Sequence, residues 1–146
     1  MRTPDTTYIG HFHEGLPHGA GKMRYTKSGS GEYEFSVYRI LIVPVMIGNF
    51  EGGFLCGQGQ TITLKGTLFA GTYENNQLIE GTAITNSGVE VVGRFHNFQP
   101  IEGEATYSTG LVYKGRMKDW KWHDDTGTAT LTFPKYDTLI LFSKCI

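Results

Sequence analysis

The sequence predicts an all-β fold: an elongated single twisted antiparallel sheet of stacked β-hairpin repeats, with one β insert. Three observations predict it. One glycine recurs in short apolar stretches, as Gly10, Gly48, Gly71, Gly93 and Gly115, with spacings of 23, 22 and 22 residues among the last four. An aromatic residue or a methionine follows each glycine two positions later, as Phe12, Phe50, Tyr73, Phe95 and Met117. A further glycine closes successive units, as Gly66, Gly88 and Gly110.

Each unit has the pattern of a strand, a tight turn, a second strand and a closing turn. Because side chains alternate across a strand, Tyr8, Gly10 and Phe12 share one face of the first strand, and Ile9 and His11 share the other. The recurrent aromatic residues therefore form a ladder along one face. We expect the recurrent glycines to lie where a side chain would obstruct a neighbouring ring. A single hairpin cannot bury such a ladder alone, so the repeats must stack.

The chain divides into repeats within one domain spanning residues 1–146. The repeats fall near residues 8–31, 46–67, 69–89, 91–111 and 113–135. Between the first two lies the insert 33–45, whose many β-branched residues favour strand over helix. We expect the insert to pack over the start of the array, with Leu41 and Val43 buried. A terminal strand is predicted within residues 138–146.

Composition excludes several classes of protein. The net charge of −1 over 146 residues provides no overall field that would attract nucleic acid or an acidic membrane. Cys56 and Cys145 match neither a disulfide framework nor a metal-ligand spacing. The first seven residues lack the apolar core of a signal peptide, and no apolar run reaches membrane-spanning length. We therefore expect an intracellular, cytoplasmic protein.

The sequence contains no convincing catalytic or phosphate-binding motif. The glycine-rich string at 19–22 differs from a phosphate loop because Leu16 replaces its first glycine and Met23 replaces the Ser or Thr after the lysine. No nucleophile is marked by a paired base. We predict no catalytic residue, no cofactor and no enzymatic activity.

His11, His13 and His18 form the one histidine cluster of the sequence. Two interpretations remain open at this stage. Three neutral imidazoles could hold Zn²⁺ with an open fourth position. Alternatively, His18 belongs to the repeat pattern and the other two are solvated, which is the interpretation without a metal that we adopt.

The first repeat carries a family resemblance in the string Tyr8-x-Gly10-x-Phe12-x-x-Gly15-x-x-His18-Gly19-x-Gly21. It resembles the MORN (membrane occupation and recognition nexus) repeat, and residues 46–59 are a near match without the histidine. The later copies drift, with alanine in place of the second glycine of the second strand. The resemblance covers roughly residues 8–133, and the chain is similar to a small stand-alone MORN protein.

The resemblance implies a function in binding rather than catalysis. Enzymes similar to this family carry their chemistry on an additional domain. The expected function is a non-catalytic protein interaction scaffold, or an accessory subunit of a cytoskeletal or ciliary assembly. An extended helix or peptide of the partner would lie along the repeats, and no nucleic acid is expected. The alternative is a peripheral phosphoinositide-binding adaptor at a membrane.

The candidate partner-binding residues lie near the C-terminus: Trp120, Trp122, Lys118, Lys121, Leu139 and Leu141. Both tryptophans fall in the longest hairpin loop, predicted at 118–125, and tryptophan is a strong hot-spot residue. The competing interpretation is that both tryptophans cap the last repeat. For the membrane alternative, the basic residues around 114–121 carry a net charge of three, worth about 3 kcal/mol at an anionic surface and at best millimolar binding.

Overall fold

The computed structural model describes residues 2–3, 6–25, 45–134 and 139–140, and every regular element in these ranges is a strand. The strands are β1 (Arg2–Thr3), β2 (Thr6–His13), β3 (Leu16–Tyr25), β4 (Val45–Glu51), β5 (Phe54–Ile62), β6 (Leu68–Glu74), β7 (Gln77–Ile84), β8 (Glu90–His96), β9 (Gln99–Thr106), β10 (Val112–Lys118), β11 (Lys121–Trp122), β12 (Thr130–Thr132) and β13 (Leu139–Ile140).

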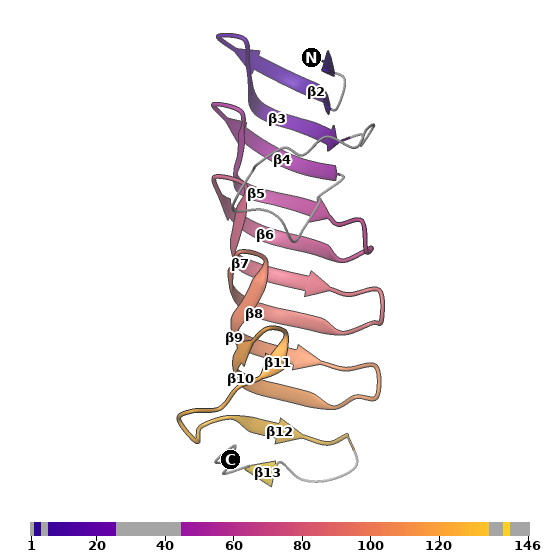
Figure 1. Ribbon diagram of the computed structural model, residues 1–146, viewed down its shortest axis with the longest axis vertical. Helices are drawn as coiled ribbons and strands as arrows, with labels where there is room; N and C mark the ends of the chain where they lie inside the picture. The colour runs from indigo at the N-terminus through magenta and orange to yellow at the C-terminus, as the bar shows by residue number, and fades with distance from the viewer. Residues whose placement is uncertain (1, 4–5, 26–44, 135–138, 141–146) are drawn as a thin grey trace.

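These strands form one antiparallel sheet in which each strand pairs with the next along the chain (Figure 1). The order runs from β1 to β10, then β12 and β13, and the short β11 pairs with β10 alone. The sheet is elongated and does not close on itself. The predicted fold class, an all-β single antiparallel sheet of stacked hairpins, is confirmed. The insert 33–45 lies outside the described residues except for Val45, which begins β4, so the expectation for Leu41 and Val43 is not addressed.

The turns between successive hairpins are alike. Gly66, Gly88 and Gly110 have φ of +80°, +81° and +82°, and each amide N–H donates to the carbonyl oxygen three residues earlier at 2.8–3.0 Å. Only glycine adopts this left-handed conformation without steric cost. The prediction that these glycines lie in the connecting turns is confirmed.

The turns at the hairpin tips are all two residues long. The later three use Asn75–Asn76, Asn97–Phe98 and Asp119–Trp120, with φ between +48° and +69° at all six positions. Positive φ at both central residues is the signature of a type I′ turn, whose twist matches that of the flanking strands. The long loop predicted at 118–125 is therefore wrong, because Lys118 pairs directly with Lys121 across a tight turn.

A continuous row of glycines crosses nine strands, from β2 to β10. Each glycine is the register partner of the next, in the order Gly10, Gly21, Gly48, Gly59, Gly71, Gly81, Gly93, Gly103 and Gly115. A Cβ at Gly71 would lie 2.2 Å from the carbonyl oxygen of Glu80 and 2.6 Å from the Cα of Gly81. The strands therefore approach each other here more closely than any side chain allows.

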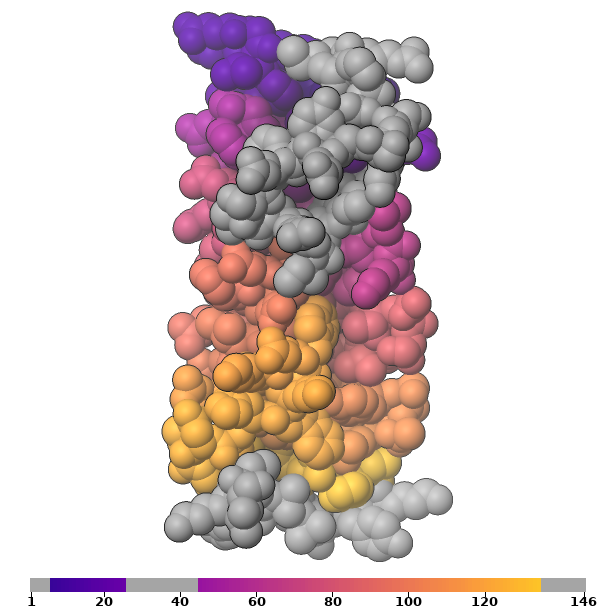
Figure 2. Space-filling model, in the orientation of Figure 1, coloured from indigo at the N-terminus to yellow at the C-terminus, as the bar shows by residue number. Residues whose placement is uncertain are grey.

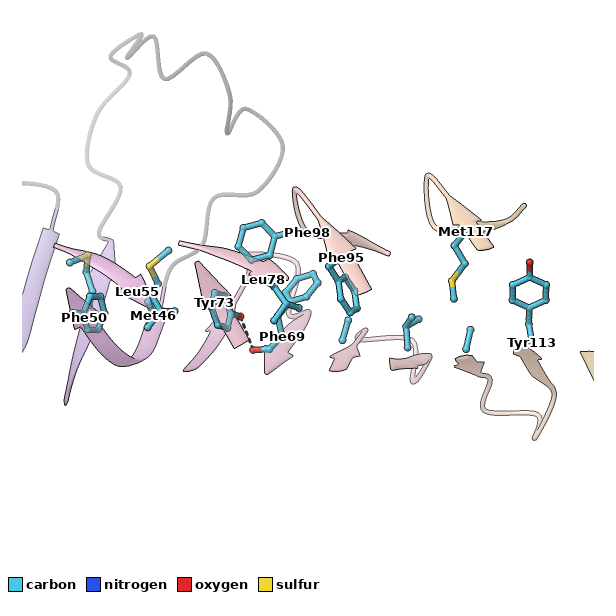
Figure 3. Packing of buried hydrophobic residues seen from close by; sticks show 14 of the residues in the cluster. Met46, Phe50, Leu55, Phe69, Tyr73, Leu78, Phe95, Phe98, Tyr113 and Met117 are labelled. Atoms are coloured by element: carbon cyan, nitrogen blue, oxygen red, sulfur yellow. Dashed lines mark hydrogen bonds between the residues drawn. The ribbon is translucent and has the colours of Figure 1, made fainter. Parts of the chain in front are cut away.

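Two rows of buried side chains flank the glycine row on the same face of the sheet, here called the inner face. The first row follows the strand register through Tyr8, Met23, Met46, Thr61, Phe69, Ala83, Val91, Ala105, Tyr113 and Leu131. The second row includes Phe50, Leu55, Tyr73, Leu78, Phe95 and Met117. The labelled members extend in a line along the array (Figure 3). We expect the glycines to leave room for neighbouring rings. At Gly21 they do, because a Cβ there would lie only 2.1 Å from the hydroxyl oxygen of Tyr8.

In the third and fourth hairpins, a bulge in the second strand keeps both rows on the inner face. In β7, Leu78 pairs with Tyr73 and Glu80 pairs with Thr72, so Ile79 has no register partner on β6. The additional residue reverses the alternation, and Leu78 and Ala83 are both buried although they are five positions apart. Simple alternation along the strand would have placed one of them in solvent.

The predicted ladder is largely confirmed and needs two corrections. Phe50, Tyr73, Phe95 and Met117 are buried, whereas Phe12 remains 45% exposed in the first hairpin, with its ring against the edge of Tyr8. The recurrent rings also do not stack on one another in sequence. Where rings of the two rows meet, the contact is edge-to-face, as between Phe69 and Phe95 at 6.0 Å.

Candidate interaction surfaces

The hairpin tips of the last two repeats fold back over the inner face. In the ribbon view the β8–β9 and β10–β11 tips cross in front of the sheet, and in the space-filling view the orange atoms of β10–β11 cover part of the front surface (Figures 1 and 2). Their second turn residues, Phe98 and Trp120, both pack against Phe69, with ring centroids 5.2 and 6.1 Å away. Phe98 is 3% exposed, and Trp120 is half-buried against the core.

The equivalent turn residue of the preceding hairpin makes polar contacts instead. Asn76 donates its backbone N–H to the carbonyl oxygen of Leu55 at 3.0 Å, and its side-chain oxygen accepts the N–H of Leu55 at 2.7 Å. The tip at Asn76 is thus attached by hydrogen bonds to the repeat before it, and the tip at Phe98 by an aromatic contact, whereas Trp120 reaches Phe69 two repeats back. The role of Phe98 was missed by the sequence analysis, although its 22-residue spacing from Asn76 and Trp120 was a signal that could have identified it.

Trp122 occupies a different environment from Trp120. Its ring stacks on Tyr113, with centroids 5.2 Å apart and an interplanar angle of 8°, and meets Tyr107 edge-on at 6.0 Å. Its indole N–H donates a hydrogen bond to the hydroxyl of Tyr107 at 2.6 Å. Trp122 is nonetheless 43% exposed. We call these three residues the aromatic platform: the indole is stacked on Tyr113 and hydrogen-bonded to Tyr107, and part of it stays exposed.

Tyr113 is the buried base of the platform. Its hydroxyl donates to the carbonyl oxygen of Arg116 at 2.6 Å. Burial raises the pKa of this phenol, and a nearby hydrogen bond partly opposes the increase. Tyr113 is therefore neutral at ordinary pH and adds no charge to the platform.

The predicted partner-binding residues do not all lie together. Lys118 is the register partner of Lys121, and Met117 is that of Trp122. Because neighbouring side chains alternate across a strand, both lysines belong to the face opposite Trp122. The backbone of Leu139 pairs with Leu131 at the end of the sheet, and Leu141 lies outside the described residues. The tryptophan and lysine parts of the predicted site are therefore separate surfaces.

The outer face of the later repeats carries alternating charges. Across successive strands the register partners are Glu80, Arg94, Glu102 and Arg116. Arg94 forms a short ion pair with Glu102, and Arg116 donates to both carboxylate oxygens of Asp125 at 2.8 Å. The Arg116 charge in the predicted basic patch is thus already compensated within the chain.

A loop anchored by Asp124 connects β11 to β12. The Oδ1 atom of Asp124 accepts hydrogen bonds from the backbone N–H groups of Thr126, Gly127 and Thr128 at 2.7–3.2 Å. The Oδ2 atom accepts one from the N–H of Ala129 at 3.2 Å. Desolvation alone would raise the pKa of this carboxyl group, but the four hydrogen bonds outweigh it and lower the pKa. The ionised carboxylate holds the loop after the platform in place.

The histidine cluster lies in the first hairpin. The rings of His13 and His18 are 5.4 Å apart, and His11 directs its Nδ1 at the carbonyl oxygen of Ala20, 3.4 Å away. Among the described residues, no group of three or more His, Cys, Asp or Glu side chains is arranged to hold a metal ion. In the same ranges, no helix is long and apolar enough to cross a membrane.

Comparison with known proteins identifies one family. The model of the MORN repeat matches residues 8–30 and 47–62, which correspond to the first hairpin and most of the second. A search of curated proteins finds no match to the chain. The matched ranges contain the first four members of the glycine row, Gly10, Gly21, Gly48 and Gly59, and the aromatic positions Phe12 and Phe50.

Proposed function

We propose that this chain, which is a MORN-repeat protein, is a non-catalytic scaffold or accessory subunit that docks another protein on its repeat array. MORN repeats generally mediate protein or membrane interactions. For this chain we assign the docking surface to the aromatic platform of Tyr107, Tyr113 and Trp122. The proposal includes an intracellular, cytoplasmic location within a cytoskeletal or ciliary assembly.

The observation that carries the proposal is the way Trp122 is held. An indole that is 43% exposed but fixed by a stacked ring and a hydrogen bond loses little conformational freedom when a partner covers it. Trp120 lacks this property, because its ring packs against Phe69 in the array. We therefore divide the two tryptophans between roles, with Trp122 in partner binding and Trp120 in stabilising the array.

The occupant that fits this surface is an extended peptide or a helix with an apolar side chain over the indole. The exposed faces of Trp122 and the half-buried Tyr107 provide apolar area together with a hydroxyl group. Partner selectivity would come from these aromatic side chains rather than from the lysines on the other face.

The test is affinity capture with the wild-type chain and two variants as baits. The affinity of each bait for the captured protein is then measured. Trp122→Ala is expected to weaken binding by about 2 kcal/mol, or roughly 30-fold. Phe54→Ala removes an aromatic ring of similar exposure, 49%, from the second hairpin and should leave affinity unchanged. Equal affinity of wild-type and Trp122→Ala protein, with a lower melting temperature for the variant, would assign Trp122 to capping instead.

The alternative is a peripheral phosphoinositide-binding adaptor. Lys114 and Lys118 share the outer face of β10, and Lys121 adjoins Lys118. Vesicles containing phosphoinositide should retain the protein in a salt-sensitive manner under this alternative, and Lys118→Glu should abolish the retention. Capture of one protein that persists at high salt supports the scaffold instead.

A further inference from the structure

A single stripe of residues crosses the outer face of six consecutive strands, β3 to β8. Its members are register partners in succession, in the order Arg24, Val45, Ile62, Leu68, Ile84 and Glu90. We call this set the outer stripe. It has four apolar residues in the middle, a cation at one end and an anion at the other.

The stripe faces away from the core because each member adjoins a buried residue of the inner face. Ile62 follows Thr61, for example, and Leu68 precedes Phe69, and both neighbours are almost fully buried. Ile62 and Ile84 are 38% and 41% exposed, and Val45 and Leu68 are half-buried. This is a contiguous apolar surface on a sheet face that no other layer of the described structure covers.

Exposed apolar residues beside the stripe widen the patch. Ile47 lies two residues from Val45 on β4 and is 39% exposed, and Val92 lies two residues from Glu90 on β8 and is 50% exposed. Six strands at about 4.8 Å spacing extend over about 24 Å. The patch is therefore large enough to contact another sheet, but smaller than a standard interface on one partner.

The order of charges makes the stripe complementary to itself. Its midpoint lies between Ile62 and Leu68, with two apolar residues and one charge on either side. A two-fold axis that passes over this midpoint, parallel to the strands and midway between the two sheets, brings Arg24 of one copy opposite Glu90 of the other, twice. Within the described residues neither side chain has an ion-pair partner in its own chain.

We propose that two copies of this chain associate back to back through the outer stripe, as a two-fold symmetric dimer. The outer faces pack as aligned sheets, about 10 Å apart, with the apolar residues in the middle and an Arg24–Glu90 contact at each end. Lys22, two residues from Arg24 on β3, adds to the positive end. Both inner faces, with their aromatic platforms, then point outward, so the dimer is bivalent for the partner.

Charge reversal provides the decisive test. Sedimentation of the full chain from about 1 μM to about 1 mM covers the affinity of an interface below standard size. Wild-type protein should dimerise, whereas Arg24→Glu and Glu90→Arg alone should each be monomeric, because both place like charges together at each end. An equal mixture of the two variants should dimerise again, because every contact in the mixed dimer pairs opposite charges.

An apolar variant provides an independent readout. Ile62→Lys, close to the axis, should abolish the dimer, while Ile101→Lys, at a site 41% exposed but outside the stripe, should not. Circular dichroism confirms that each variant keeps its strands. The proposal is overturned if wild-type protein stays monomeric over the whole range, or if its dimer is insensitive to both charge reversals. Failure of the mixture to restore the dimer would also overturn it.

Discussion

Replacing Gly81 with alanine tests whether close strand approach along the glycine row holds the sheet together. A Cβ at Gly81 would lie 2.1 Å from the carbonyl oxygen of Ala70 and 2.8 Å from the Cα of Gly71, at φ +158°. A normal carbon–oxygen contact is about 3.3 Å or more, so β6 and β7 must separate by about 1 Å. The obstructing atoms belong to backbone and cannot rotate away.

The cost follows from two contributions. Overpacking of this kind costs about 1–3 kcal/mol, and weakening two ladder hydrogen bonds costs about 1 kcal/mol each. We therefore expect Gly81→Ala to lower the free energy of unfolding by about 3–5 kcal/mol. Because a domain of this kind has a total stability of only about 5–15 kcal/mol, the variant will be at the limit of folding.

Gly88→Ala is the matched control, because it also has a positive φ but has space around it. Its nearest atom is the Cβ of Ser108 at 3.9 Å, so its cost is limited to the left-handed conformation, about 1–2 kcal/mol. Urea unfolding of both variants, followed by tryptophan fluorescence and circular dichroism, measures the difference. Equal losses for Gly81→Ala and Gly88→Ala would refute the argument from close approach.

Three further predictions concern the buried seam and the loop after the platform. Phe95→Ala should lower the free energy of unfolding by about 3–5 kcal/mol, since the ring is 3% exposed, and a loss below about 1 kcal/mol in urea unfolding would contradict the core assignment. Tyr73→Phe should cost about 1–3 kcal/mol, because the buried hydroxyl of Tyr73 hydrogen-bonds to Thr61 at 2.9 Å; combining it with Thr61→Val should recover part of the loss in a double-mutant cycle. Burial raises the pKa of Tyr73 to about 12, so this part of the stability is present below pH 10 and lost as pH rises towards 12, and spectroscopic titration should find one tyrosine ionising last. Four backbone hydrogen bonds outweigh desolvation and lower the pKa of Asp124 below 3.8. The contribution of Asp124 to the free energy of unfolding is therefore present above pH 3.8 and lost as the pH falls further. Asp124→Asn should remove this acid-dependent part of the stability, and an unchanged dependence of stability on pH would disprove the assignment.

The sequence alone determined the repeat, the strand content and the buried residues that follow the recurrent glycine of each first strand. The 22-residue spacing fixed the positions of Gly66, Gly88 and Gly110 in equivalent turns, because a left-handed turn selects glycine locally. Alternation within a first strand placed Phe50 and Phe95 in the core, because side-chain direction is set by the backbone of that strand. These are properties of short segments, and the sequence records them directly.

Only the tertiary structure decided how the second strands pair and where the tips fold. The bulge opposite Tyr73 shifts the alternation of β7. Nothing about isoleucine at position 79 predicts this bulge, because the shift arises from pairing with β6. Phe98 and Trp120 adopt positive φ, which their propensities disfavour, because their rings are buried against Phe69 from a preceding repeat. The separation of Trp122 from Lys118 likewise follows from a tight turn that tertiary packing stabilises. The bulge and the tight turn come from pairing within a hairpin, whereas the contacts of Phe98 and Trp120 join different repeats, so no single repeat of the sequence contains both partners.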